Sequence, residues 1–161
     1  MTYQFRKYTF EEMYLPASAR FVIDEEHDTI ALKPVPEILF PINDDSVISV
    51  LVNYYIVNTK VKHVLVIARK LDVSTRDLSS TVHLLTGMNH DDLLRNYRLR
   101  AIIELLTSTK LSTQTIATFF GYPKLHAFNR FLSDQTGLTA NEIREGKSSE
   151  EKIKRLPWWK M

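Results

Sequence analysis

The sequence predicts a mainly α-helical fold, in which one long helix joins two similar helical units and a short N-terminal segment carries a β-hairpin. Apolar residues recur at three- and four-residue spacing from Asp45 to Gly146, which is the period of amphipathic helices. A stretch of about 30 residues occurs twice in this region with the same order of apolar, capping and glycine positions. Residues 1–44 lack this period and contain short extended runs and prolines instead.

Composition indicates a soluble protein with a genuine apolar core. The chain has 161 residues, of which 44% are apolar and 25% charged. It has no cysteine, which excludes disulfides, thiolate zinc sites and cysteine nucleophiles and is compatible with a reducing cytoplasm. Met1–Phe10 lacks the apolar core of a signal peptide, and the apolar run Ser46–Val57 is too short to span a membrane. We therefore expect a cytoplasmic protein.

Charge is distributed unevenly along the chain. Residues 1–45 carry a net charge of −5, residues 46–146 a net charge of +4 and residues 147–161 a net charge of +3. This pattern fits a small N-terminal β-containing segment at 1–44, a helical domain at 45–146 and a basic tail at 147–161 that contains Trp158-Trp159. The modest basic excess of the helical domain suits either nucleic acid or an ordinary solvated surface.

The N-terminal segment has the pattern of a β-hairpin followed by an extended connector. Arg20–Asp24 and Thr29–Lys33 are short extended runs around a polar turn. Three prolines then exclude a regular helix or central strand and mark the domain boundary: Pro34, Pro36 and Pro41.

The first helical unit is expected at about 45–88. Its first helix carries apolar residues at helical spacing, although its β-branched content leaves a strand as an alternative: Ile48, Leu51, Val52 and Tyr55. A second helix follows around Val64–Leu71. Ser74 with Asp77 forms a capping-box pattern that begins a third helix, and Gly87 is the expected left-handed stop.

A long helix is expected at about 89–107. Asn89 is its N-cap, and Asp91 and Asp92 complement its N-terminal dipole. Its apolar stripe consists of Leu94, Tyr97, Ala101 and Leu105.

The second unit is expected at about 108–146. Ser112 caps a short helix, the turn Gly121-Tyr-Pro123 follows, and the next helix covers Lys124–Gln135. Gly137 ends that helix. Thr139 and Glu142 form a capping box for the last one.

The two units align as an internal repeat. Ile67-Ala68 aligns with Ile116-Ala117, and Thr86-Gly87 aligns with Thr136-Gly137, with one extra residue in the second turn. Each copy has the layout of a helix-turn-helix, although a helical-hairpin repeat that binds protein would show similar spacing. A connecting helix of 18 or so residues is about 27 Å long. With packing offsets, it can separate two recognition helices by the roughly 34 Å between successive major grooves.

The residues of both units resemble the AraC/XylS family of bacterial transcription regulators. The most specific segment is Ile116–Tyr122, followed by Phe128–Phe131, Thr136–Thr139 and Ile143-Arg144. The first unit matches at Ile67-Ala68, Ser74, Leu78, Thr86–Met88 and Arg98-Leu99. The resemblance implies a homeodomain-like, AraC-type domain that binds specific DNA sequences, and it favours an activator that contacts RNA polymerase.

Several positions depart from the family pattern. Ala140 stands where proline is usual, Leu132-Ser133 replaces a basic Phe-Lys pair, and Asp72 takes the usual glycine position of the first turn. Ser79-Ser-Thr81 replaces basic or aromatic residues on the first recognition helix. We therefore expect the second unit to dominate DNA affinity and the first to adjust specificity.

The resemblance assigns candidate DNA contacts position by position. The expected base readers are Arg76, Ser79 and Ser80 in the first unit and Lys124, His126, Asn129 and Arg130 in the second. Arg130 has two further interpretations, a phosphate clamp and an internal ion-pair partner. Lys62 and Lys110, each close to the start of a helix, are candidate phosphate contacts, with solvated surface lysines as the alternative. Arg98 is expected to face inward.

No enzymatic function is predicted. The histidines lack a metal-ligand spacing with a third ligand, and the sequence has no phosphate-binding glycine loop or nucleophile elbow. We expect no cofactor. The expected partners are double-stranded DNA, RNA polymerase and a second copy of the chain bound through the N-terminal segment. The alternative function is a protein-interaction module that kept this fold but binds DNA weakly.

Overall fold

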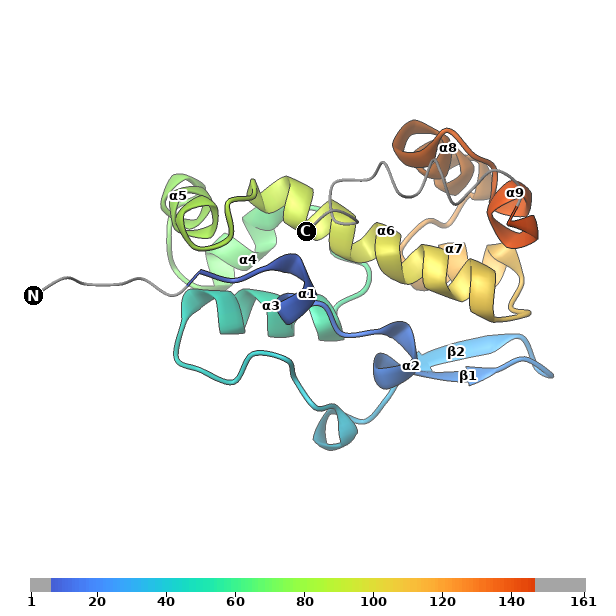
Figure 1. Ribbon diagram of the computed structural model, residues 1–161, viewed down its shortest axis with the longest axis horizontal. Helices are drawn as coiled ribbons and strands as arrows, with labels where there is room; N and C mark the ends of the chain where they lie inside the picture. The colour runs from blue at the N-terminus through green and yellow to red at the C-terminus, as the bar shows by residue number, and fades with distance from the viewer. Residues whose placement is uncertain (1–6, 147–161) are drawn as a thin grey trace, which may run out of the picture.

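A central helix, α6 (His90–Ser108), connects the two halves of the molecule (Figure 1). The computed structural model describes residues 7–146, so the predicted tail with Trp158-Trp159 lies outside the described residues. The fold is mainly helical with one small hairpin, as the sequence predicted. Among residues 7–146, none of the helices combines the length and the apolarity that a bilayer-spanning segment needs.

The first unit consists of α3 (Val47–Val57), α4 (Val64–Lys70) and α5 (Thr75–Thr86). The strand alternative for 48–55 is wrong, because Ser46 accepts a hydrogen bond from the Ser49 N–H and begins a helix there. Ser74 caps α5 through the Asp77 N–H, and Gly87 ends α5 with a φ of 73°. These local signals confirm the predicted helices.

The second unit consists of α7 (Thr113–Phe119), α8 (Leu125–Thr136) and α9 (Ala140–Glu145). The predicted caps are present, with Ser112 on α7 and a complete capping box between Thr139 and Glu142 on α9. Lys124 lies just outside α8, as its N-cap.

The N-terminal segment contains α1 (Phe10–Met13), α2 (Ala17–Arg20), β1 (Phe21–Asp24), β2 (Thr29–Leu32) and a 3₁₀ turn at Val35–Glu37. The predicted hairpin is confirmed, with Phe21 opposite Leu32 and Asp24 opposite Thr29. Arg20, which the sequence placed in the first strand, instead ends α2. The segment packs into the same apolar core as both units, through Tyr8, Phe10 and Met13 among others. The division of the chain at residues 44 and 146 stays a prediction.

Helix α6 is buried on more of its surface than the single predicted apolar stripe would cover. Besides the four predicted apolar positions, the buried residues of α6 are Leu93, Asn96, Leu99, Ile102, Ile103 and Leu106. The wider burial arises because α6 contacts α4 and α5 of the first unit, α7 and α9 of the second, and α2 of the N-terminal segment. A helix with three sets of neighbours needs apolar side chains nearly all round.

The two helix-turn-helix turns have the same backbone hydrogen bonds. The Val73 N–H donates to the Ala68 carbonyl in the first turn, and the Tyr122 N–H donates to the Ala117 carbonyl in the second. Each turn needs one residue in the left-handed region, which is Asp72 (φ 54°) in the first and Gly121 (φ 85°) in the second. Asp72 therefore takes a glycine-like backbone conformation that aspartate tolerates better than most residues.

The hairpin is attached to the second unit at its turn. Asp28 accepts hydrogen bonds from the Ser112 N–H at 2.8 Å and from the Thr115 hydroxyl at 2.9 Å, and Glu25 accepts one from the Lys110 N–H at 3.2 Å. The hydrogen bonds from Ser112, and then that from Thr115, hold the pKa of Asp28 below its ordinary value.

Gly121 should tolerate alanine less well than Gly87, although both have a positive φ. A Cβ at Gly121 would lie 3.2 Å from the Lys60 Cβ, whereas a Cβ at Gly87 would meet nothing within 4 Å. We expect Gly87→Ala to cost about 1–2 kcal/mol of unfolding free energy from backbone strain alone. Gly121→Ala should cost at least about 1 kcal/mol more, because the close neighbour must also shift. Urea unfolding of both variants measures this; equal losses would contradict it.

The contribution of Asp28 to stability should depend on pH. A carboxyl group whose pKa is lowered in the folded state stabilises the fold above its unfolded pKa, and this stabilisation is lost as pH falls through the folded pKa. The difference in unfolding free energy between the wild type and Asp28→Asn should therefore be constant above about pH 5 and shrink below about pH 4. Denaturant unfolding between pH 3 and pH 7 measures it. A difference that grows on acidification would contradict the assignment.

Candidate nucleic-acid interface

The exposed face of α8 carries the predicted readers of the second unit. Lys124, His126, Asn129 and Arg130 are all exposed. Positions 126, 129 and 130 share one face of α8 because they are three and four residues apart, while Phe128 and Leu132 are buried on the opposite face. None of these four side chains forms a hydrogen bond or an ion pair with another residue of 7–146. Within this part of the chain, the interpretation of Arg130 as an internal ion-pair partner is therefore wrong. Their polar groups are available to a ligand.

The corresponding face of α5 is smaller and less charged. Arg76 and Ser80 are exposed and Ser79 is half-buried. A shallow groove of about 550 Å³ runs beside α5, lined by Ser79, Ser80, His83, Leu84 and Asn89. His83 was treated only as a surface histidine in the sequence, yet its spacing from Ser79 and Ser80 places it on the same face.

A 50-residue offset relates the two faces. His126, Asn129 and Arg130 of α8 correspond to Arg76, Ser79 and Ser80 of α5, because both helices begin after an N-cap 50 residues apart and end at glycines 50 residues apart. Even the internal bonds repeat: Thr86 donates to the Val82 carbonyl at 2.8 Å, and Thr136 donates to the Leu132 carbonyl at 2.7 Å. The polar faces are thus equivalent in position but not in charge.

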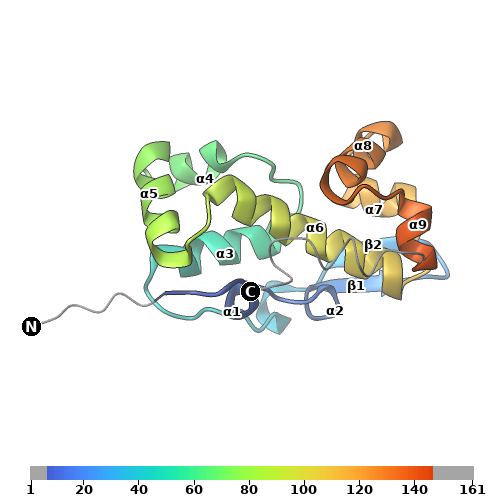
Figure 2. The ribbon, with the colours of Figure 1, turned by 45° about the horizontal axis from the view of Figure 1, so that its top comes forward.

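The two helices that carry these faces lie near opposite ends of α6. In the two views, α5 lies beside the N-terminal end of α6 and α8 lies above its C-terminal half, whereas the N-terminal segment and the hairpin lie below α6 (Figures 1 and 2).

Two basic side chains pack against aromatic rings of α8 and of the turn that precedes it. The Lys62 ammonium lies 4.0 Å from the centre of the Tyr122 ring and donates to the Gly121 carbonyl at 2.6 Å. The Arg98 guanidinium lies 4.8 Å from the centre of the Phe131 ring and donates to the Val61 carbonyl at 3.2 Å. Burial, and then the neighbouring Arg98, lower the pKa of Lys62. This cluster joins the loop before α4 to the second unit.

The two expected phosphate contacts differ in their surroundings. The bond to Gly121 occupies one of the three donors of the Lys62 ammonium, so its phosphate contact stays a prediction. Lys110 has an exposed side chain, but its backbone N–H binds Glu25 at the acidic hairpin turn. Its phosphate contact also stays a prediction. Arg98 faces inward, as expected.

Comparisons with known proteins agree with this arrangement. Residues 67–146 match a family model described as a helix-turn-helix domain. The solved structure of the xylose-binding transcription activator XylR is similar to 73% of this chain, at 20% sequence identity and a TM-score of 0.53. The matched part is 30% of that chain, so the likeness concerns the fold and not the whole of XylR. No curated protein sequence matches this chain.

The exposed readers should be dispensable for stability, in contrast to the arginine behind them. Arg76→Ala and Asn129→Ala should each change the unfolding free energy by less than about 0.5 kcal/mol, because neither side chain has a partner among residues 7–146. Arg98→Ala should lower it by about 1–3 kcal/mol, because Arg98 packs on Phe131 and bonds to Val61. Urea unfolding distinguishes them. A loss in Arg76→Ala as large as in Arg98→Ala would mean that Arg76 is structural.

Proposed function

We propose that this chain is a DNA-binding helix-turn-helix transcription regulator of the AraC/XylS type, and that it reads two successive major grooves of one duplex. The observation that carries the proposal is the pair of equivalent polar faces on α5 and α8, two helices that lie near opposite ends of α6. One chain would then present two recognition helices to one face of the DNA.

The dimensions of α6 support this arrangement. Its 19 residues give a length of about 28 Å at 1.5 Å per residue. Successive major grooves on one face of a duplex are about 34 Å apart, and the packing of α5 and α8 beyond the ends of α6 adds to their separation. Two grooves one helical turn apart are therefore within reach.

We assign the side chains different tasks in this proposal. Asn129 suits adenine, and Arg130 and Arg76 suit guanine, because amide and guanidinium groups form paired hydrogen bonds with those bases. Lys124 and His126 add to the base-reading face of α8, and Ser79 and Ser80 add to that of α5. Lys62 and Lys110 serve phosphates. Because α8 has the more basic face, the second unit supplies most of the affinity and the first adjusts specificity.

Regulation is part of the proposal. We propose that the bound protein activates transcription through RNA polymerase, on the basis of the family resemblance. A monomer is sufficient for binding, because each chain has two reading helices. The homodimer expected through the N-terminal segment stays a prediction.

A protein-interaction module is the second candidate function. The observation that favours it is the nearly neutral face of α5, where Leu84 is 55% exposed next to the groove lined by Ser79, Ser80 and His83. Apolar exposure of this kind suits a protein surface better than a DNA groove. Under this alternative, DNA binding would be weak at every sequence.

Asn129→Ala should weaken binding to a duplex selected for the protein by about 5- to 150-fold, the equivalent of about 1–3 kcal/mol. The loss should vanish when the base pair that Asn129 reads is changed. Asn141→Ala on α9 is the matched control, since Asn141 is also exposed and the proposal assigns it no contact. Binding should be measured by fluorescence anisotropy at several salt concentrations.

Wild-type affinity should fall steeply as salt rises, because phosphate contacts release counterions. Equal effects of Asn129→Ala and Asn141→Ala would contradict the role of α8. Weak binding at every sequence, insensitive to salt, would contradict DNA reading and favour the protein-interaction module.

A further inference from the structure

The N-terminal segment is bonded to both helix-turn-helix units. At one end, the Tyr8 N–H donates to the Leu85 carbonyl in the last turn of α5 at 2.8 Å. At the other, Asp28 in the hairpin turn accepts hydrogen bonds from Ser112 and Thr115 at the beginning of the second unit. The segment thus spans the molecule beneath α6 (Figure 1).

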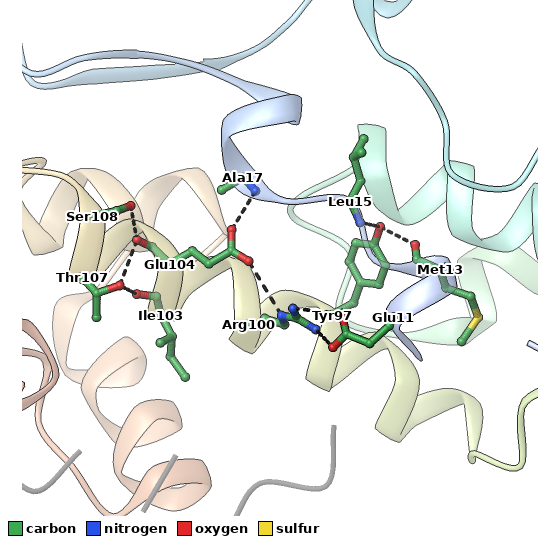
Figure 3. A network of polar contacts seen from close by, with 10 residues as sticks. All are labelled: Glu11, Met13, Leu15, Ala17, Tyr97, Arg100, Ile103, Glu104, Thr107 and Ser108. Carbon is green, nitrogen blue, oxygen red and sulfur yellow. Dashed lines mark hydrogen bonds and ion pairs between the residues drawn. The ribbon is translucent and has the colours of Figure 1, made fainter. Parts of the chain in front are cut away.

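Its middle is held along α6 by a polar network (Figure 3). The buried Tyr97 hydroxyl accepts from the Leu15 N–H and donates to the Met13 carbonyl, both at 2.9 Å. About two turns further along α6, Glu104 accepts from the Ala17 N–H at 2.8 Å. These bonds use backbone groups of the segment, so they fix its path and not only its side chains.

Arg100 ties the two parts of this network together. Its guanidinium forms two hydrogen bonds with the Glu11 carboxylate, at 2.5 and 3.2 Å, and lies 3.8 Å from a Glu104 oxygen. A guanidinium that meets a carboxylate with two parallel bonds fixes orientation as well as distance. The segment is therefore held in register along α6.

Two neighbouring residues bind different units. Arg20 is 2% exposed and donates to the Tyr55 and Ile56 carbonyls at the end of α3, each at 3.2 Å. Phe21 packs edge-on against Phe119 of α7, with ring centres 4.9 Å apart. Because Arg20 and Phe21 are adjacent in the chain, a relative movement of the two units would have to break one of these contacts.

We propose that residues 8–32 are a brace that sets the separation and relative rotation of α5 and α8, with Asp28 as a positioning residue. Helix α6 and the loop before α4 already join the two units, but contacts along one line still permit rotation about that line. The brace lies on the other side of α6 and adds a second, offset line of contacts. It thereby restricts the spacing of the half-sites that one chain can bind.

The proposal rests on the two-groove function, and it is tested by changing the distance between the two half-sites of the DNA. Duplexes should carry the selected site, the same site with one or two base pairs inserted between its half-sites, and the second half-site alone. The test variants are Asp28→Ala, which removes the carboxylate acceptor of the Ser112 N–H and the Thr115 hydroxyl and leaves the bond from Lys110 to Glu25, and Thr115→Val, which removes a donor to Asp28 without changing charge. Glu26→Ala is the matched control, because it removes the same charge from the same turn and Glu26 is exposed, with no hydrogen bond or ion pair to the second unit among residues 7–146.

The measured quantity is the ratio of affinities for the native and the lengthened site. A general electrostatic effect of removing an acidic group raises both affinities and leaves this ratio unchanged. We expect the wild type and Glu26→Ala to prefer the native spacing by at least about tenfold, by analogy with the cost of a lost base contact. Asp28→Ala and Thr115→Val should reduce this preference at least about threefold, with unchanged affinity for the single half-site.

The possible outcomes distinguish a failure of the brace proposal from a failure of two-groove reading. Unchanged spacing preference in both test variants, with the wild type still selective, would overturn the brace and leave two-groove reading intact. A wild type that binds the full site no better than the single half-site would overturn both. Lower affinity for the half-site alone in the test variants would mean that Asp28 supports the fold of the second unit, and would also overturn the positioning role.

Discussion

The rest of the structure depends on the burial of α6 by three sets of neighbours. The helix contacts α4 and α5, α7 and α9, and the N-terminal segment, so its apolar residues cannot be confined to one stripe. Each of these contacts fixes one part of the molecule relative to a common axis. The positions of the polar faces of α5 and α8 follow from this one helix, because α5 and α8 each pack in a unit that α6 anchors.

Two buried polar side chains at α6, those of Tyr97 and Arg20, bond to backbone groups of other elements. The Tyr97 hydroxyl bonds to two backbone groups of the N-terminal segment, and burial raises the pKa of Tyr97 to about 12. Arg20 is held by two carbonyls and by the Phe21 ring, 4.7 Å away. Buried polar groups of this kind favour one arrangement over others, because an alternative packing would leave them unsatisfied. The proposed readers Arg76, Asn129 and Arg130 are the opposite case, exposed and without a hydrogen-bond or ion-pair partner across residues 7–146.

The features that could be predicted from the sequence are those set by neighbouring residues in the chain. Caps such as Asn89, Ser112 and Thr139 act within one turn, so their helices were placed correctly. The exposure of Asn129 followed from its spacing relative to Phe128 and Leu132. The docking of the N-terminal segment could not be predicted, because it depends on partners about 80 residues apart, as between Leu15 and Tyr97. The bond from Lys62 to Gly121 was hidden for the same reason.

Hydroxyl-radical footprinting on a selected duplex tests the central claim most directly, provided that the number of chains bound per duplex is measured in the same samples. The account predicts two protected windows on one face of the DNA, centred about 10 base pairs apart, with one chain bound. A single window with one chain, or two windows only when two chains are bound, would contradict it.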